Sequence, residues 1–341
     1  MEAFIREGRP KERANGEPMP PAPGKHGGDG GSGPYGVDVY YSDETGKILG
    51  TGGGIKKVRE FFGGSTFVVF NGKIVCNVDI ARAVAFHKSM GALATMVLRP
   101  EPDPYSWGAV EVDGEGWIQS IAGVMRPDAE EAKKAAKKRA SDGEGNGEGG
   151  GDGMERICWE PDIPVRGYVF TGIHIMEPEF LDILSEGPSC VVRDGYFNHL
   201  KACAPLAGFV HEGYWQDHST PARYINGNLR VLDWQTGIFE NTGFPKLNGV
   251  HPDAEISESA AIVPPVRICA GARVGAGARV GPGAVIGKGA VVKPGKVVSN
   301  SVVWDGVEVA GDAVSSVVTQ DGVVSVDLTD PGAKTGPLLK R

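Results

Sequence analysis

The chain lacks any hydrophobic run long enough to cross a bilayer, and its five cysteines show neither CxxC spacing nor a neighbouring histidine cluster. Their spacing excludes a sequence-defined zinc site, and their odd number is typical of a reducing compartment. Positive charge is in deficit, since 43 acidic residues against 35 lysines and arginines leave a net charge of −8. This balance argues against nucleic acid as a partner. We expect a cytoplasmic protein that binds neither nucleic acid nor membrane.

The length of the chain predicts more than one folded domain. A chain of 341 residues with 40% hydrophobic content can form two cores. Its 52 glycines gather in low-complexity segments and in a C-terminal repeat. We expect a disordered segment at 1–34, a domain over 35–235 with a low-complexity insert at 127–157, a β-helix over 250–326 and a disordered tail at 327–341.

The stretch from residue 48 to 97 has the strongest pattern in the first domain. A glycine-rich segment, Gly50–Gly54, precedes a short helical run, and a β-branched and aromatic block at 66–70 predicts a buried strand. A helix over 79–90 and a second buried strand over 92–98 follow. This order is typical of α/β units, in which ligands bind beyond the carboxyl ends of parallel strands. We therefore expect a parallel sheet with Gly50–Gly54 and Asn71–Lys73 on one rim.

As a set, these motifs resemble those of the sugar-nucleotide pyrophosphorylases, which join a nucleoside triphosphate to a sugar 1-phosphate. That family carries LGTAGG, a strand ending in NGD, a helix with a histidine, and GAxxT. This chain has LGTGGG at 49–54, NGK at 71–73, His87 and GALAT at 91–95. The resemblance implies an α/β, Rossmann-like nucleotidyltransferase core. It also implies nucleotide binding by Gly50, Thr51, Gly52 and Gly53.

Two later segments resemble the strands that flank the sugar in that family. WGAVEVD at 107–113 is similar to YGxVExD, and FTGI at 170–173 matches FTGI. The resemblance implies sugar binding by Gly108, Glu111, Thr171 and Gly172. For Glu111 the alternative is a plain strand that ends in the Asp113-Gly114 turn. For His174, which follows the second segment, we expect a packed strand histidine.

A metal site is implied by GYWQDHSTP at 213–221, which resembles GYWxDIGTPxxY, with Tyr224 completing the motif. The aspartate of that motif is one of the family's two Mg²⁺ ligands. The resemblance therefore implies Asp217 as a metal ligand and Mg²⁺ as the cofactor if the chain is active. The alternative is that Asp217 or Ser219 caps a helix beginning at Pro221.

The chain departs from the family at three places that touch the chemistry. Lys73 stands where the family has its other metal-binding aspartate, and an ammonium cannot ligate a cation. Lys73 either ends metal-dependent chemistry or attracts a triphosphate itself as a point charge. The family's GxGTRxxP phosphate loop and its EKP motif have no counterpart here. We expect an N-terminally truncated core and assign no catalytic residue.

The C-terminal part carries an aliphatic residue every six positions, at Ile256, Ile262, Ile268, Val274, Val280, Ile286, Val292 and Val298. A small residue often stands two positions earlier. This period predicts a left-handed parallel β-helix of nearly three coils, with three faces per coil and an extension through Trp304 and Val309. Such helices often assemble, so we expect a homo-oligomer. Acyl transfer would need a histidine base, and His251 lies ahead of the first coil.

These features leave more than one function open. One hypothesis is an enzyme of the sugar-nucleotide pyrophosphorylase type, with a nucleoside triphosphate and a sugar 1-phosphate as partners. The alternative is a catalytically degenerate regulatory or assembly subunit of the same fold, which acts through its β-helix. A hexapeptide acyltransferase is less favoured. A reading frame that is incomplete upstream of Met1 is a further alternative.

Overall fold

The computed structural model describes residues 3–6, 38–128, 163–232 and 248–329. Among these, one compact unit holds the residues up to Gly72 together with Asp79–Glu212, and a second holds Lys73–Val78 and the residues from Gly213 onward. The segment Lys73–Val78 therefore groups with the C-terminal repeat, although the sequence prediction included it in a domain over 35–235. Most of the predicted insert and of the predicted disordered ends lies outside the described residues.

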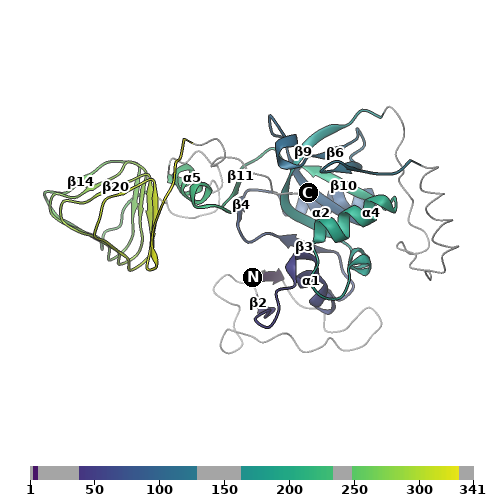
Figure 1. Cartoon of the computed structure of the whole chain (residues 1–341), viewed down its shortest axis with the longest axis horizontal. Coiled ribbons are helices and arrows are strands. Elements are labelled where there is room, and N and C mark those ends of the chain that lie inside the picture. The colour runs from purple at the N-terminus through teal and green to yellow at the C-terminus, as the bar shows by residue number, and fades with distance from the viewer. Residues whose placement is uncertain (1–2, 7–37, 129–162, 233–247, 330–341) are drawn as a thin grey trace. The chain divides into compact units, whose positions relative to one another are not determined.

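The first unit is built on a mixed sheet of seven strands in the order β10-β5-β9-β6-β7-β8, with β3 also paired to β9 (Figure 1). Only β10 and β5 run parallel, and the other neighbours are antiparallel. The strands are β3 (Phe67–Phe70), β5 (Ala94–Arg99), β6 (Val110–Val112), β7 (Ile118–Ile121), β8 (Val124–Met125), β9 (Arg166–Met176) and β10 (Leu206–Val210). The expectation of a parallel sheet was wrong for β3 and β5, because β9 lies between them and pairs antiparallel with both.

Strand β9 is the centre of this sheet because its sequence suits burial on both faces. Its residues from Val169 to Met176 are all buried, as expected for a strand covered on both sides. The register against β5 shifts between Met96 and Leu98, opposite Gly172, whose φ is +85°. A β-bulge at a glycine of positive φ explains the shift. The glycine of the FTGI segment thus has a backbone role in the sheet.

The helices of the first unit begin and end at residues whose chemistry suits those positions. Asp79 caps α2, since its carboxylate accepts a hydrogen bond of 2.9 Å from the Arg82 backbone N–H, and Gly91 ends the helix with a φ of +59°. The predicted helix over 79–90 is confirmed. The helical segments are α1 (Gly50–Lys57), η1 (Arg59–Phe62), α2 (Ile80–Met90), η2 (Tyr105–Trp107), η3 (Pro178–Ile183), and the π-helical η4 (Val191–Tyr196) continuing into α4 (Phe197–Lys201).

A two-stranded ribbon precedes α1. Strand β1 (Ala3–Arg6) pairs antiparallel with β2 (Asp38–Tyr41). The predicted disorder over 1–34 was wrong for these four residues, since the edge of β2 offers unpaired backbone groups that another extended segment can satisfy. The Tyr40 ring of β2 packs edge-on against Phe61, with the ring centroids 5.2 Å apart. The ribbon is thereby tied to the hydrophobic core of the first unit.

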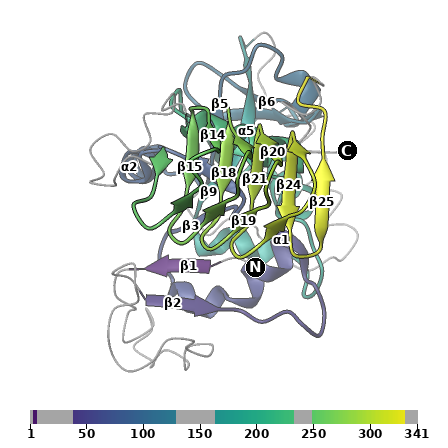
Figure 2. The same ribbon diagram turned by 90° about the vertical axis from the view of Figure 1, so that its left-hand side faces the viewer.

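The second unit contains a parallel β-helix with three sheets (Figures 1 and 2). Their strand orders are β12-β15-β18-β21-β24-β25, β13-β16-β19-β22 and β14-β17-β20-β23. The strands are β12 (Gly249–Val250), β13 (Glu255–Ile256), β14 (Ala261–Ile262), β15 (Val266–Ile268), β16 (Arg273–Val274), β17 (Arg279–Val280), β18 (Ala284–Ile286), β19 (Val291–Val292), β20 (Val297–Ser299), β21 (Ser301–Val303), β22 (Glu308–Val309), β23 (Ala313–Val314), β24 (Ser316–Thr319) and β25 (Gly322–Ser325). The repeat prediction is confirmed, and the two four-stranded sheets extend it beyond three coils.

The inner core of the β-helix is formed by the aliphatic residues of the repeat and by the small residues two positions before them. The regular spacing ends after Val298, because Val303 rather than Trp304 takes the next inward place. The β-helix extends through Trp304 and Val309 as predicted, but Val309 is buried in the core whereas Trp304 is 46% exposed. On the outer side of one sheet, Val302 and Val317 pack with Ile225 of helix α5 (Pro221–Leu232).

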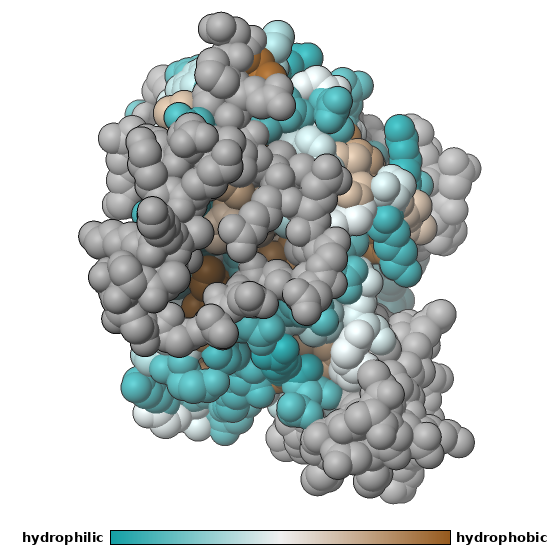
Figure 3. Space-filling model, turned by 90° about the vertical axis from the view of Figure 1, so that its right-hand side faces the viewer, coloured by the Kyte–Doolittle hydropathy of each residue, from teal (hydrophilic) through white to brown (hydrophobic). Residues whose placement is uncertain are grey.

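None of the described helices combines the length and hydrophobicity that crossing a bilayer requires. Figure 3 shows one face of the molecule, on which most of the coloured residues are hydrophilic.

Candidate functional site

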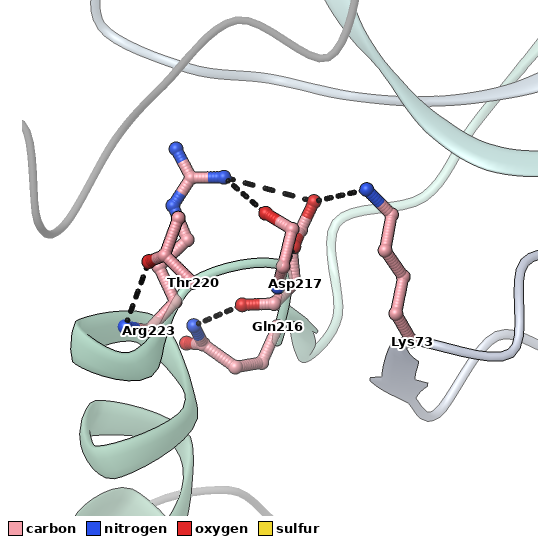
Figure 4. Close-up of polar contacts among 6 residues, drawn as sticks. Lys73, Gln216, Asp217, Thr220 and Arg223 are labelled. Atoms are coloured by element: carbon pink, nitrogen blue, oxygen red, sulfur yellow. Dashed lines mark hydrogen bonds and ion pairs between the residues drawn. The ribbon is translucent and has the colours of Figure 1, made fainter. Parts of the chain in front are cut away.

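The second unit brings Lys73 and Asp217 together through a short antiparallel ribbon. Strand β4 (Ile74–Cys76) pairs with β11 (Trp215–Asp217), with Ile74 opposite Asp217. The pairing continues past the strands, since the His218 backbone N–H donates to the Lys73 carbonyl oxygen at 2.9 Å. Lys73 and Asp217 are far apart in the sequence, so the register of this ribbon alone makes them neighbours (Figure 4).

The Asp217 carboxylate is held by two cations. Its Oδ2 lies 3.4 Å from Lys73 Nζ and 3.7 Å from a terminal nitrogen of Arg223. The Asp217 side chain is 1% exposed and that of Arg223 5%, whereas that of Lys73 is 42% exposed. Oδ2 is buried and accepts no hydrogen bond, so charge attraction alone holds this oxygen. The cluster as a whole presents the lysine ammonium to solvent.

Helix α5 positions Arg223 behind the carboxylate. Thr220 caps the helix, because its hydroxyl oxygen accepts a hydrogen bond of 3.3 Å from the Arg223 backbone N–H (Figure 4). The alternative that Asp217 or Ser219 caps α5 was therefore wrong. The Asp217 carboxylate instead accepts from the Ser219 backbone N–H in the turn before the helix. The Arg223 guanidinium donates to the Ser219 hydroxyl at 3.0 Å, which fixes its orientation.

Sequence reasoning did not identify Arg223 as part of this site. Its spacing from Asp217 could have pointed to it. A side chain in the first turn of the predicted helix can lie beside the residues just before that helix. Burial lowers the pKa of the neighbouring His218, although its hydrogen bond with the Lys73 backbone and the charge of Asp217 act in the opposite direction. Its ring lies against Gly227, where a side chain would overlap it.

The glycine-rich segment Gly50–Gly53 forms the first turn of α1 in the first unit. The Gly52 N–H donates to the Ser189 carbonyl oxygen at 2.9 Å, and the Thr51 hydroxyl accepts from the Val191 N–H at 3.0 Å. A Cβ on Gly52 would lie 2.6 Å from the Ser189 hydroxyl, and one on Gly53 would overlap the carbonyl oxygen at position 187. Close packing against the 187–191 segment thus requires glycine here. Nucleotide binding by these four residues stays a prediction.

The predicted sugar-binding residues lie on neighbouring strands of the first unit. Glu111 of β6 faces Gly167 of β9. Its carboxylate accepts hydrogen bonds from the Tyr105 hydroxyl at 3.0 Å and from the Ser120 hydroxyl. Hydrogen bonding to this carboxylate is the main cause that raises the pKa of Tyr105. Gly108, with a φ of +79°, ends the short helix η2 just before β6.

Thr171 and Gly172 lie at the bulge of β9. Thr171 is fully buried, and its hydroxyl donates to the Val97 carbonyl oxygen at 2.7 Å. The Gly172 carbonyl oxygen accepts from the Asn71 N–H at 3.1 Å. The Thr171 side chain therefore joins β9 to β5 inside the sheet. Sugar binding by Gly108, Glu111, Thr171 and Gly172 remains a prediction.

Comparison with known proteins decides the family. The family model described as "Nucleotidyl transferase" matches residues 26–233, which is more than half of the chain. The chain belongs to the nucleotidyl transferase family. Its mixed sheet and helices are the Rossmann-like core of that family, and the β-helix follows that core in the chain.

Three curated relatives of the family show the range of sequence similarity. The mannose-1-phosphate guanylyltransferase of Mycobacterium tuberculosis is 27% identical over 246 residues, covering 72% of this chain and 56% of the relative. The UTP--glucose-1-phosphate uridylyltransferase of Synechocystis sp. is 30% identical over 165 residues, covering 45% and 34%. A probable mannose-1-phosphate guanylyltransferase of Oryza sativa is 25% identical over 244 residues, covering 69% and 57%. The chain thus spans roughly half of the length of these relatives or less.

Members of the nucleotidyl transferase family commonly use a divalent metal, and the described residues of this chain do not fit one. Asp217 is the single carboxylate at the predicted metal position, and Lys73 and Arg223 already neutralise it. Nowhere in the described ranges do three histidine, cysteine or acidic side chains come close enough together to hold a metal ion. Mg²⁺ prefers several oxygen ligands and avoids a neighbouring ammonium. The prediction of Asp217 as a metal ligand therefore has no support from its surroundings.

Proposed function

We propose that this chain binds the ligands of its family without catalysing nucleotidyl transfer by itself. These ligands are a nucleoside triphosphate, a sugar 1-phosphate, or the sugar nucleotide made from them. The observation that carries the proposal is the ion pair between Lys73 and Asp217, 3.4 Å apart. Transfer of a nucleotidyl group needs strong stabilisation of the charge on the reacting phosphates. A carboxylate already neutralised by two cations cannot recruit a metal for that purpose.

The ligand-binding part of the proposal rests on the first unit. Gly50 and Thr51, which are exposed at the start of α1, would approach the nucleotide at the amino end of the helix. Gly52 and Gly53 are buried against the 187–191 segment and would support this turn from behind. Glu111, whose carboxylate is oriented by Tyr105 and Ser120, would accept hydrogen bonds from sugar hydroxyls. The Thr171 hydroxyl would contribute by holding β9 against β5.

The second candidate is the transfer reaction itself. The presence of Asp217 and Glu111 at the positions of the family's motifs favours it. The sugar-phosphate oxygen would attack the α-phosphorus of the triphosphate, the bond between the α-phosphorus and its bridging oxygen would break, and pyrophosphate would leave. Lys73 and Arg223 would then supply positive charge near the phosphates. The relatives are named for GTP- and UTP-type reactions on mannose 1-phosphate and glucose 1-phosphate, so both substrate pairs should be tested.

The experiment combines binding and turnover on the same preparation. Thermal stabilisation by GDP-mannose and by UDP-glucose measures binding, and a coupled pyrophosphate assay with GTP plus mannose 1-phosphate, or UTP plus glucose 1-phosphate, measures transfer in millimolar Mg²⁺. We expect stabilisation by a sugar nucleotide and no release of pyrophosphate. Release that depends on both substrates would replace the proposal by the second candidate. Failure of all these ligands to bind would overturn both.

We further propose that the chain assembles through its β-helix as a homo-oligomer. Strand β25 is the last strand in its sheet among the described residues, and its Val323 and Val324 side chains are 58% and 48% exposed. Exposed apolar side chains on a terminal strand favour association. Light scattering after gel filtration should show a mass above 35.9 kDa. A monomer at micromolar concentration would refute the assembly.

Acyl transfer by the β-helix has little support. His251 lies at the first turn of the helix, where its ring accepts a hydrogen bond of 3.1 Å from the Asp253 backbone N–H. A shallow hollow along one face is lined by residues such as Glu255, Arg273 and Pro294 and includes no histidine. The histidine base that acyl transfer normally uses is therefore missing from the lining of that hollow.

A further inference from the structure

The group that the Asp217 cluster presents to solvent is a cation. The Asp217 side chain is buried, Arg223 lies behind it, and the Lys73 ammonium alone is substantially exposed. A cation diffusing toward this position meets a like charge first. An anion meets an ammonium on a flexible stem, which is a common way for proteins to bind phosphate.

The charge of the cluster also favours an anionic ligand. Lys73 and Arg223 share the single Asp217 carboxylate, whose Oδ2 lies 3.4 Å from the first and 3.7 Å from the second, so this carboxylate does not offset both cations. The Lys73 ammonium has three N–H donors, and its one ion-pair partner at 3.4 Å leaves donors that can point to solvent. Asp217 keeps the ammonium in place, since its Oδ2 is buried without a hydrogen bond and is stabilised by the two cations.

Helix α5 adds to this positive character. Its twelve residues begin at Pro221, directly after the turn that contains Asp217. The amino end of a helix carries partial positive charge and favours anions nearby. The Ser219 and Thr220 residues of that turn are exposed, and their hydroxyls can donate hydrogen bonds to phosphate oxygens.

We propose that Lys73 takes the place of a divalent cation at Asp217, so that this site binds a phosphoryl group directly and without metal. The identity of the ligand, the phosphate of a nucleotide or of a sugar phosphate, rests on the function proposed above. The chemistry of the site does not depend on that choice, because any phosphoryl oxyanion meets the same ammonium, hydroxyls and helix end.

The first test measures binding of inorganic pyrophosphate to the full chain by calorimetry, in EDTA and again in Mg²⁺. We expect binding in EDTA that Mg²⁺ does not tighten. Lys73→Ala should weaken it about tenfold or more, since a charge-assisted hydrogen bond is lost, and Lys73→Arg should retain it. Lys88→Ala, at an exposed lysine of α2, is the matched control and should bind like the unmodified chain. Equal binding by Lys73→Ala, or binding only in Mg²⁺, would overturn the proposal.

The second test uses Mn²⁺ as a probe of the metal position, followed by electron paramagnetic resonance. We expect the unmodified chain to bind no more Mn²⁺ than the Lys73→Ala variant binds. Lys73→Asp would place a second carboxylate beside Asp217 and should gain a Mn²⁺ site. Circular dichroism confirms that each variant is folded. Stoichiometric Mn²⁺ binding by the unmodified chain that Asp217→Asn abolishes would show a metal site and refute the replacement.

The two proposals fail in different ways. Binding of GDP-mannose or UDP-glucose only in the presence of Mg²⁺ would agree with the proposed function and refute the metal-free phosphoryl site. Binding of pyrophosphate in EDTA through Lys73, with no binding of either sugar nucleotide, would support the site and overturn the proposed function.

Discussion

His174 makes the first unit acid-sensitive, and the size of the effect follows from its burial. Its side chain is 2% exposed within β9, its Nδ1 lies 3.0 Å from the Tyr196 hydroxyl, and its ring packs edge-on against Phe170. Burial lowers the pKa of His174 from 6.5 to about 3. The expectation of a packed strand histidine is confirmed.

The direction of the effect follows from proton binding in the two states. Between pH 6.5 and about 3, the unfolded chain binds a proton at His174 and the folded chain does not. The free energy of unfolding is therefore highest above pH 6.5 and falls as the pH drops toward the folded-state pKa. With 1.36 kcal/mol per pH unit, His174 alone should remove about 2 kcal/mol between pH 7 and pH 5.

We would measure this with His174→Gln, which can still pair with the Tyr196 hydroxyl but cannot take up a proton. Pulsed hydrogen exchange of β9 peptides along a urea series reports the first unit separately from the β-helix. The loss of stability from pH 7 to pH 5 should be about 2 kcal/mol smaller in the variant than in the unmodified chain. Burial also lowers the pKa values of His87 and His199, but both residues are present in both proteins and cancel.

The matched control is His251→Gln, at a partly exposed position of the β-helix, which should leave the β9 result unchanged. An equal loss of stability in His174→Gln and in the unmodified chain would refute the reasoning. It would mean that His174 takes up its proton in the folded protein, or that β9 opens at mildly acidic pH.

Three further substitutions test the packing of the chain. Gly53→Ala should destabilise the first unit by about 2 kcal/mol or more, because the added methyl overlaps the facing backbone. The control Gly46→Ala, with open space around it, should change the melting temperature little. Equal effects of the two substitutions would argue against close packing at Gly53. Ile286→Ala should cost the β-helix about 2–5 kcal/mol in a urea titration, since this residue is fully buried. Val314→Ala, 53% exposed, should cost much less, and a similar loss would place Ile286 outside the core. Thr220→Ala should cost about 1 kcal/mol through loss of the α5 cap, and exchange in α5 that stays unchanged would contradict that assignment.

The sequence by itself determined the helices and strands that depend on interactions between residues close together in the chain. The six-residue period of the C-terminal part predicted the β-helix, because each inward position recurs once per face and must be apolar. Asp79 and Gly91 marked the ends of α2, since capping depends on residues within one turn of the helix. The motif set between residues 49 and 224 was enough to indicate the family.

Only the tertiary structure decided what depends on distant residues. β9 enters the sheet between β3 and β5, and no periodicity within 48–97 contains that information. In the sequence, Lys73 was a departure from one motif and Asp217 a match to another, and the register of β4 and β11 joins them in one ion pair. Pairing between strands that are separated by many other elements is set by the fit of those elements, so the charge that this site presents could be found only after the chain had been folded.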